Sequence, residues 1–101
     1  MQIGRVAGTV VSTQKETTLQ GVKFLLVQLV DIQGQLTPGY QVAADRVGAG
    51  VDEWVLVTLG SSARKIDRGD PLPVDAAVIG IIDTVTIAGQ LLYSKRAQAR
   101  S

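Results

Sequence analysis

The sequence contains no cysteine and no histidine. Without cysteine the chain has no disulfide, no thiolate metal site and no cysteine nucleophile. Without histidine it lacks the commonest general base near neutral pH, the Ser-His-Asp arrangement and imidazole metal ligands. The side chains from which most active sites are built are missing, so we expect no catalytic residue, no cofactor and no bound metal.

Aromatic residues and net charge are also scarce. The chain has one Phe, one Trp and two Tyr, and ten basic against nine acidic residues leave a net charge of +1. No global field attracts nucleic acid, an anionic membrane or an acidic substrate. No apolar run approaches the roughly 20 residues needed to span a bilayer. We therefore expect a soluble cytoplasmic protein that binds neither nucleic acid nor membrane.

Valine, leucine, isoleucine and alanine dominate the apolar residues and fall into short blocks, several of which alternate with period two. This pattern predicts β-strands. The block 23–31 is apolar on both alternating faces, so either it crosses the core or a second subunit covers its outer face. The predicted strands are residues 3–13, 23–31, 40–47, 53–59 and 76–87, with a short additional strand in 90–93.

Glycine and proline mark the joints between these blocks. The joint at residues 32–40 holds Gly34 and Pro38-Gly39 and predicts a turn, because proline presets φ and glycine accepts positive φ. Residues 61–66 predict a single helical turn capped by Ser61 or Ser62. Closure into a barrel removes the strand edges that so apolar a sheet would otherwise expose. We therefore predict an all-β fold, a small closed or nearly closed five-stranded barrel with one short helix.

The loop at Gly48-Ala49-Gly50 invites comparison with a phosphate-binding loop. Such a loop needs a lysine followed by serine or threonine, or a third glycine that opens a helix. Here Val51, Asp52 and Glu53 follow instead. The carboxylates repel phosphate and lack the spacing of a calcium loop. The sequence therefore favours a turn between two strands.

The hydroxyls of Ser61 and Ser62 have no histidine to activate them, although Lys65 is near in sequence. Capping of a short helix is the favoured use of these serines. Two alternatives stay open from the residues alone. One is an enzyme that uses Ser62, Lys65 or Asp75, and the other is an OB-type module that binds single-stranded nucleic acid.

Six short motifs follow one another over most of the chain, and together they resemble the bacterial microcompartment vertex family, also called the EutN/CcmL family, and within it the carboxysome branch. The motifs are "IGRVAGTVVST" at 3–13, "LQGVKFLLVQ" at 19–28, "VAADRVGAG" at 42–50, "EWVLV" at 53–57, "GSSARK" at 60–65 and "PVDAAVIGIIDTV" at 73–85.

This resemblance implies an OB-like barrel that assembles as a homopentamer and closes the corners of a polyhedral carboxysome shell tiled by hexameric facet proteins. It implies a structural role in carbon dioxide fixation. The barrel would span residues 1–88, and an extension at 89–101 would contact a neighbouring subunit. Asp52 stands where some relatives outside the carboxysome branch carry glycine.

Small residues allow backbones to approach closely, so we expect two segments to line a subunit contact or the five-fold axis. Their residues are Gly48, Ala49, Gly50, Ser61, Ser62, Ala63 and Arg64. The extension would be anchored on the neighbouring subunit by Leu91, Leu92 and Tyr93.

Overall fold

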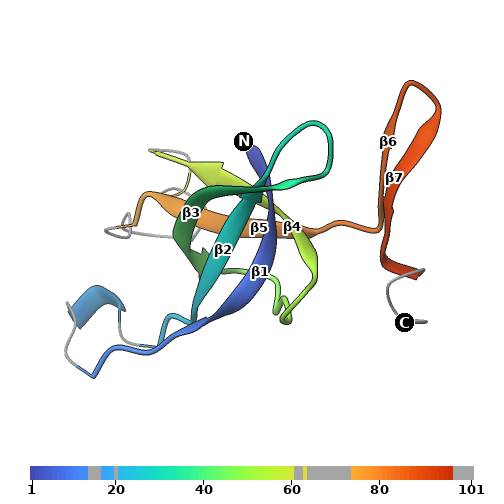
Figure 1. The fold of residues 1–101 in the computed structure, drawn as a ribbon. Helices are drawn as coiled ribbons and strands as arrows, with labels where there is room; N and C mark the ends of the chain where they lie inside the picture. Colours follow the sequence, from blue (N-terminus) through green and yellow to red (C-terminus); the bar gives the residue numbers. More distant parts are fainter. Residues whose placement is uncertain (14–16, 20, 61–62, 64–73, 97–101) are drawn as a thin grey trace.

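The computed structural model describes residues 1–13, 17–19, 21–60, 63 and 74–96 (Figure 1). Within this part of the chain nearly all regular structure is β-strand, and no helix has the length and hydropathy of a membrane span. The elements are β1 (Gln2–Val10), the 3-10 helix η1 (Thr17–Leu19), β2 (Phe24–Val30), β3 (Leu36–Asp45), β4 (Trp54–Leu59), β5 (Ala76–Ile81), β6 (Thr84–Ile87) and β7 (Gln90–Ser94).

The first five strands close into a barrel in the order β1-β2-β3-β5-β4, with β4 pairing back to β1. Neighbouring strands are antiparallel except β3 and β5, which pair in parallel over two residues. The predicted closed five-stranded barrel is confirmed.

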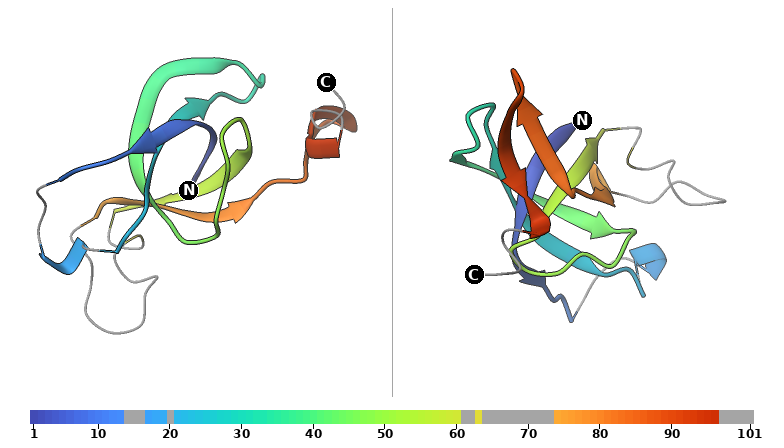
Figure 2. Two further views of the ribbon diagram at one scale, coloured as in Figure 1. Left: turned by 90° about the horizontal axis from the view of Figure 1, so that it is seen from below. Right: turned by 90° about the vertical axis from the view of Figure 1, so that its right-hand side faces the viewer.

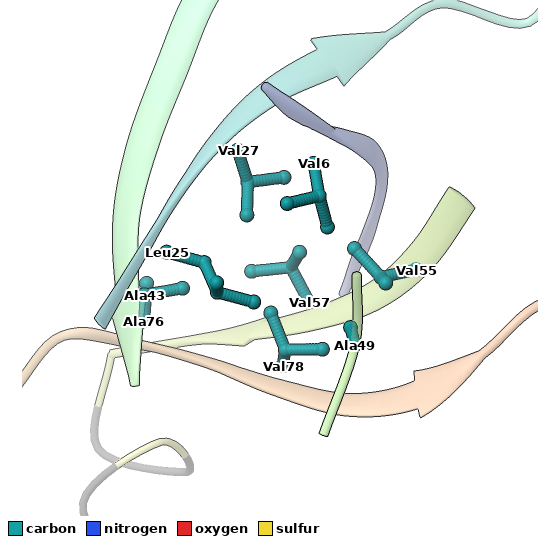
Figure 3. Close-up of a cluster of buried hydrophobic side chains, with 9 residues drawn as sticks. All are labelled: Val6, Leu25, Val27, Ala43, Ala49, Val55, Val57, Ala76 and Val78. Atoms are coloured by element: carbon teal, nitrogen blue, oxygen red, sulfur yellow. The ribbon is translucent and has the colours of Figure 1, made fainter. Parts of the chain in front are cut away.

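The barrel core consists of valine and alanine side chains with a single leucine, most of which point inward from alternate strand positions (Figure 3). Such residues suit the pleated wall of a narrow barrel, whose interior has room only for side chains. Eight of the nine come from the five strands, and the ninth comes from the loop before β4. They are Val6, Leu25, Val27, Ala43, Ala49, Val55, Val57, Ala76 and Val78.

The turn predicted in the joint 32–40 lies at the start of that joint, since the chain reverses at residues 31–35. The part of the prediction that assigned Pro38-Gly39 to the turn is wrong, because both residues lie inside β3. At the reversal Asp31 Oδ1 accepts hydrogen bonds from two backbone amides, at 2.9 and 3.0 Å, and Gly34 has a φ of +80°. The proline is tolerated because a register shift in the β2–β3 pairing lies opposite it, where a missing N–H interrupts no regular ladder.

The single long strand predicted at 76–87 is also wrong. β5 ends at Ile81, the chain leaves the barrel, and β6 begins at Thr84. β6 and β7 form a separate two-stranded hairpin beside the barrel (Figures 1 and 2). The boundary expected between residues 88 and 89 therefore falls in the tip of this hairpin, where Ala88 and Gly89 have φ of +51° and +78°.

Candidate functional site

The loop between β3 and β4 is organised by the carboxylate of Asp45, whose side chain is only 1% exposed. Asp45 Oδ1 accepts hydrogen bonds from the amides of Val47, Gly48 and Ala49 at 3.1, 3.0 and 3.3 Å. Its second oxygen lies 3.7 Å from Lys23 Nζ. The amides with which a loop of this kind would hold a phosphate are thus bonded to the chain's own carboxylate.

A second carboxylate, that of Glu53, joins this loop to the hairpin. Glu53 Oε1 accepts a hydrogen bond from the Gly50 amide at 2.6 Å, and Oε2 lies 2.8 Å from Lys95 Nζ at the end of β7. The hydrogen bond from Lys95 is the main reason that the pKa of Glu53 lies below its ordinary value. The same contact raises the pKa of Lys95. Both groups therefore stay ionised over a wider pH range than they would alone.

Asp52 has a φ of +74°. Side chains rarely adopt this left-handed conformation, but glycine adopts it without strain. In this chain Asp52 also forms an ion pair with Arg5 at 2.6 Å, between two exposed side chains. Asp52 therefore holds a backbone conformation that side chains rarely adopt and adds an exposed contact to β1.

Ala49 serves a different purpose from the one its small size suggested. It is 2% exposed and lies in the barrel core with Val55 and Val78 (Figure 3). The adjacent glycines, Gly48 and Gly50, are exposed, and Gly48 has a φ of +77°. Contact between these glycines and another subunit stays a prediction.

Most of the predicted contact segment after β4 lies outside the described residues, namely Ser61, Ser62 and Arg64 together with the predicted helical turn at 61–66. Ala63 is described and buried. Its amide donates a hydrogen bond to the Gly60 carbonyl at 3.1 Å, and its side chain packs with Ala44 and Ala77 outside the barrel core.

The hairpin packs on the barrel of its own chain. Tyr93, which is 5% exposed, stacks on Trp54 with ring centroids 4.2 Å apart and an interplanar angle of 12°. Leu92 covers Gly34 so closely that a Cβ there would lie 3.0 Å from the leucine. Leu91, in contrast, is 61% exposed. Of the three predicted anchors, Leu91 is therefore the one with an open side chain.

No local sequence pattern indicated the contacts of Trp54 with Tyr93 or of Glu53 with Lys95, because each joins β4 or its approach to a segment far along the chain. These contacts hold a loop and a hairpin in place. Among the described residues no group of three or more acidic, histidine or cysteine side chains is placed to hold a metal ion. The arrangement is suited to shaping surfaces for contact.

Comparison with known proteins agrees with this geometry. Residues 1–83 match the protein family described as "Ethanolamine utilisation protein EutN/carboxysome". The chain is 62% identical to the carboxysome shell vertex protein CcmL of Gloeobacter violaceus, over 99% of this chain and 100% of that protein. The solved structure of that CcmL superposes with a TM-score of 0.91, covering 95% of this chain and 99% of the other. GrpN, a pentameric microcompartment shell protein from Rhodospirillum rubrum, is 44% identical with a TM-score of 0.78, covering 87% and 99%.

Proposed function

The chain belongs to the EutN/CcmL family, and we infer from this that it is a structural protein of the carboxysome shell, in which it forms the pentameric vertices. The observation that carries this conclusion is the extent of the match. The similarity to carboxysome vertex proteins includes the β6–β7 hairpin as well as the barrel, because it spans nearly the whole chain. The protein therefore acts in the compartment that concentrates and fixes carbon dioxide.

In this proposal the five-fold symmetry of the pentamer is what allows the shell to close at a vertex. A flat sheet of hexagonal tiles cannot close, and five-fold units supply the curvature. A ring of five identical chains uses a heterologous interface, in which each subunit presents two different surfaces to its two neighbours. The direct partners at the rim of the ring are, in this proposal, the hexameric facet proteins of the same shell.

We assign the protein no catalytic role. Its family is one of structural shell vertices, and the carboxylates of its loops are used to fix the chain. Asp45 binds three loop amides, and Glu53 binds Gly50 and Lys95. Neither carboxylate is paired with a nucleophile in these contacts.

The hairpin is proposed to supply one of the two surfaces of the ring interface. It carries two exposed large apolar side chains, Leu91 and Ile87, which the strand register places on opposite faces, and the face of Leu91 is the one proposed for the contact. The loop glycines Gly48 and Gly50 are proposed to lie near the same boundary or near the five-fold axis, where an absent side chain permits close approach.

Sedimentation velocity of the purified protein tests the pentamer. A stable species of five subunits is expected at micromolar concentration, and a single subunit under those conditions would contradict the vertex assignment. Leu91→Glu tests the hairpin, because a carboxylate introduced at a buried contact weakens assembly. Gln90→Glu, at the adjacent exposed position, is the matched control and should leave the pentamer intact.

The packing of the aromatic residues disfavours the nucleic-acid alternative. Proteins that bind single strands stack the bases on aromatic side chains in a basic groove. Here Trp54 and Tyr93 are buried against each other, and of the four aromatic rings Tyr40 alone is largely exposed, which leaves no row of rings on which successive bases could stack. Titration with labelled oligonucleotides at low salt should give no saturable binding.

A further inference from the structure

The outward side of β1, β2 and β3 carries an apolar row that the barrel core does not use. In the strand register Gly8 lies opposite Leu26, and Leu26 lies opposite Val42. Residues on either side of Leu26 and Val42, such as Leu25 and Ala43, point into the core, so this row points away from it. In the adjoining row Tyr40 pairs with Gln28. We call Gly8, Leu26, Val42 and Tyr40 the outer face.

Two side chains of the outer face remain substantially open in the single chain. Tyr40 is 63% exposed and Val42 is 42% exposed, whereas Leu26 between the strands is half-buried. Single exposed apolar residues are ordinary, but a contiguous set on one sheet face indicates an interaction surface. The outer face therefore explains why the block 23–31 is apolar on both sides. One side fills the barrel core, and the other is available for contact with another chain.

Gly8 is an independent indication that another chain packs closely against the outer face. Glycine within a strand lowers stability relative to alanine, and it often marks the close approach of another backbone. The other glycine of β1, Gly4, is explained within the chain, because a Cβ there would collide with Val27 and lie 3.1 Å from the Gln28 carbonyl oxygen.

No such explanation holds for Gly8. A Cβ at Gly8 would meet no atom within 4 Å among the described residues, and its φ lies outside the left-handed region that favours glycine. The register shift between Val6 and Gly8 requires no glycine at this conformation. The described residues thus do not explain the missing side chain, which is expected where a second chain packs over the row formed with Leu26 and Val42.

We propose that the outer face of β1–β2–β3 is the second of the two surfaces of the ring interface, and that its occupant is the next copy of this chain. The proposal rests on the proposed function, since it takes the pentamer from the family relationship. A pentameric relative with 44% identity and a TM-score of 0.78 over 87% of this chain supports a neighbouring copy as the occupant. The exposed Leu91 of the hairpin provides an apolar contact on that copy.

The apolar character of the face also fits this occupant. Stable protein interfaces bury about 800 Å² on each partner around an apolar centre. The outer face supplies such a centre, and the ion pair of Arg5 with Asp52 provides a charged rim, because Arg5 lies opposite Gln28 in the row of Tyr40.

Two substitutions on the face test the proposal by sedimentation velocity. Gly8→Leu fills the space proposed for the neighbour, and Val42→Glu places a charge there. Each is expected to convert the five-subunit species into single subunits at micromolar concentration. Val11→Glu is the control, because Val11 is 87% exposed beyond the end of β1, and this variant should remain pentameric. Far-ultraviolet circular dichroism establishes that each variant is folded.

The outcomes distinguish the two levels of inference. A wild-type protein that sediments as a single subunit contradicts the vertex assignment and the interface with it. A pentameric wild type whose Gly8→Leu and Val42→Glu variants also remain pentameric overturns the outer-face proposal alone. Dissociation of the Val11→Glu variant to the same degree also overturns the outer-face proposal, because the loss of the pentamer would then not be specific to substitutions on the outer face.

If the Gly8→Leu and Val42→Glu variants do not fold, a thiol-labelling measurement tests the same proposal. The sequence has no cysteine, so Tyr40→Cys introduces the only thiol at a position that is open in the single chain. In the pentamer this thiol is expected to react with a soluble maleimide at least tenfold more slowly than the thiol of Val11→Cys. Equal rates would show that the face is free in the assembled ring and would overturn the proposal.

Discussion

Replacing Tyr93 with alanine removes the ring that joins the β6–β7 hairpin to the barrel. Tyr93 stacks on Trp54 with centroids 4.2 Å apart and is 5% exposed, so nearly all of its side chain is withdrawn from water. The hairpin has only two strands, and such hairpins are marginal in water without packing. Loss of the ring should therefore release the hairpin before the barrel unfolds.

The size of the effect follows from the buried ring. An aromatic side chain buries about 200 Å², which at about 25 cal/mol per Å² corresponds to about 5 kcal/mol as an upper bound. Substitutions of buried aromatic residues by alanine typically cost about 3 to 5 kcal/mol. Taking about 3 kcal/mol for a ring at the edge of the fold, the fraction of chains with an open hairpin should rise by roughly two orders of magnitude.

Two measurements report the opening directly. Trp54 is the only tryptophan, so the fluorescence spectrum reports on the partner of the lost ring, and the emission should shift to longer wavelength. The Lys95 amide, which donates to the Asp83 carbonyl at 2.8 Å, should exchange its hydrogen roughly 100-fold faster. Tyr93→Phe keeps the ring and should behave like the wild type in both measurements.

The reasoning would be refuted by a Tyr93→Ala variant with unchanged Trp54 emission and less than a roughly tenfold acceleration of exchange at Lys95. Such a result would mean that the remaining contacts, Leu92 on Gly34 and Lys95 on Glu53, hold the hairpin without the stack. Both proteins must be compared at the same concentration, because assembly stabilises the folded chain by mass action.

Three further predictions concern the barrel and its loop. Gly4→Ala should lower the free energy of unfolding by about 1 to 3 kcal/mol in urea titrations, because its Cβ collides with Val27. Asp45→Ala should cost about 1 to 3 kcal/mol in the same titrations, since three amides lose their acceptor, whereas Asp45→Asn keeps an acceptor and should cost less. The pKa of Glu53 is lowered from 4.5 chiefly by the hydrogen bond from Lys95. The ionised carboxylate therefore stabilises the fold at pH values above 4.5, and this stabilisation is lost as the pH falls through the lowered pKa. Glu53→Gln should remove this acid dependence from thermal melting curves.

Period-two alternation was enough to predict the strands of the barrel, because inward and outward positions differ in polarity wherever a strand forms its wall. It did not reveal the break between β5 and β6, since the alternation continues across residues 82 and 83 while the chain leaves the barrel. The start of β3 was missed for a related reason. Pro38-Gly39 has the composition of a turn, but an irregular stretch of strand accepts it.

The site was less predictable than the fold. The sequence singled out the loop at residues 48–50, and the resemblance placed it at a contact, but Ala49 turned out to fill the core of its own barrel. The sequence allowed Asp45 to be weighed only as a metal ligand and did not indicate that it organises this loop, because its partners are backbone amides, which have no sequence signature. The stack of Trp54 on Tyr93 depends on tertiary folding and leaves no local pattern.

The filled interior of the barrel has a consequence for the permeability of the shell. Nine side chains, all 2% exposed or less, occupy the bore, and Ala49 reaches into it from the loop before β4 (Figure 3). A barrel of five strands is too narrow to hold both these side chains and a passage. The barrel of each vertex subunit therefore offers no passage through its interior. A gas molecule that crosses the shell at a vertex must pass between neighbouring subunits or along the axis of the ring. The packing of the subunits at these two places therefore determines how permeable each vertex is.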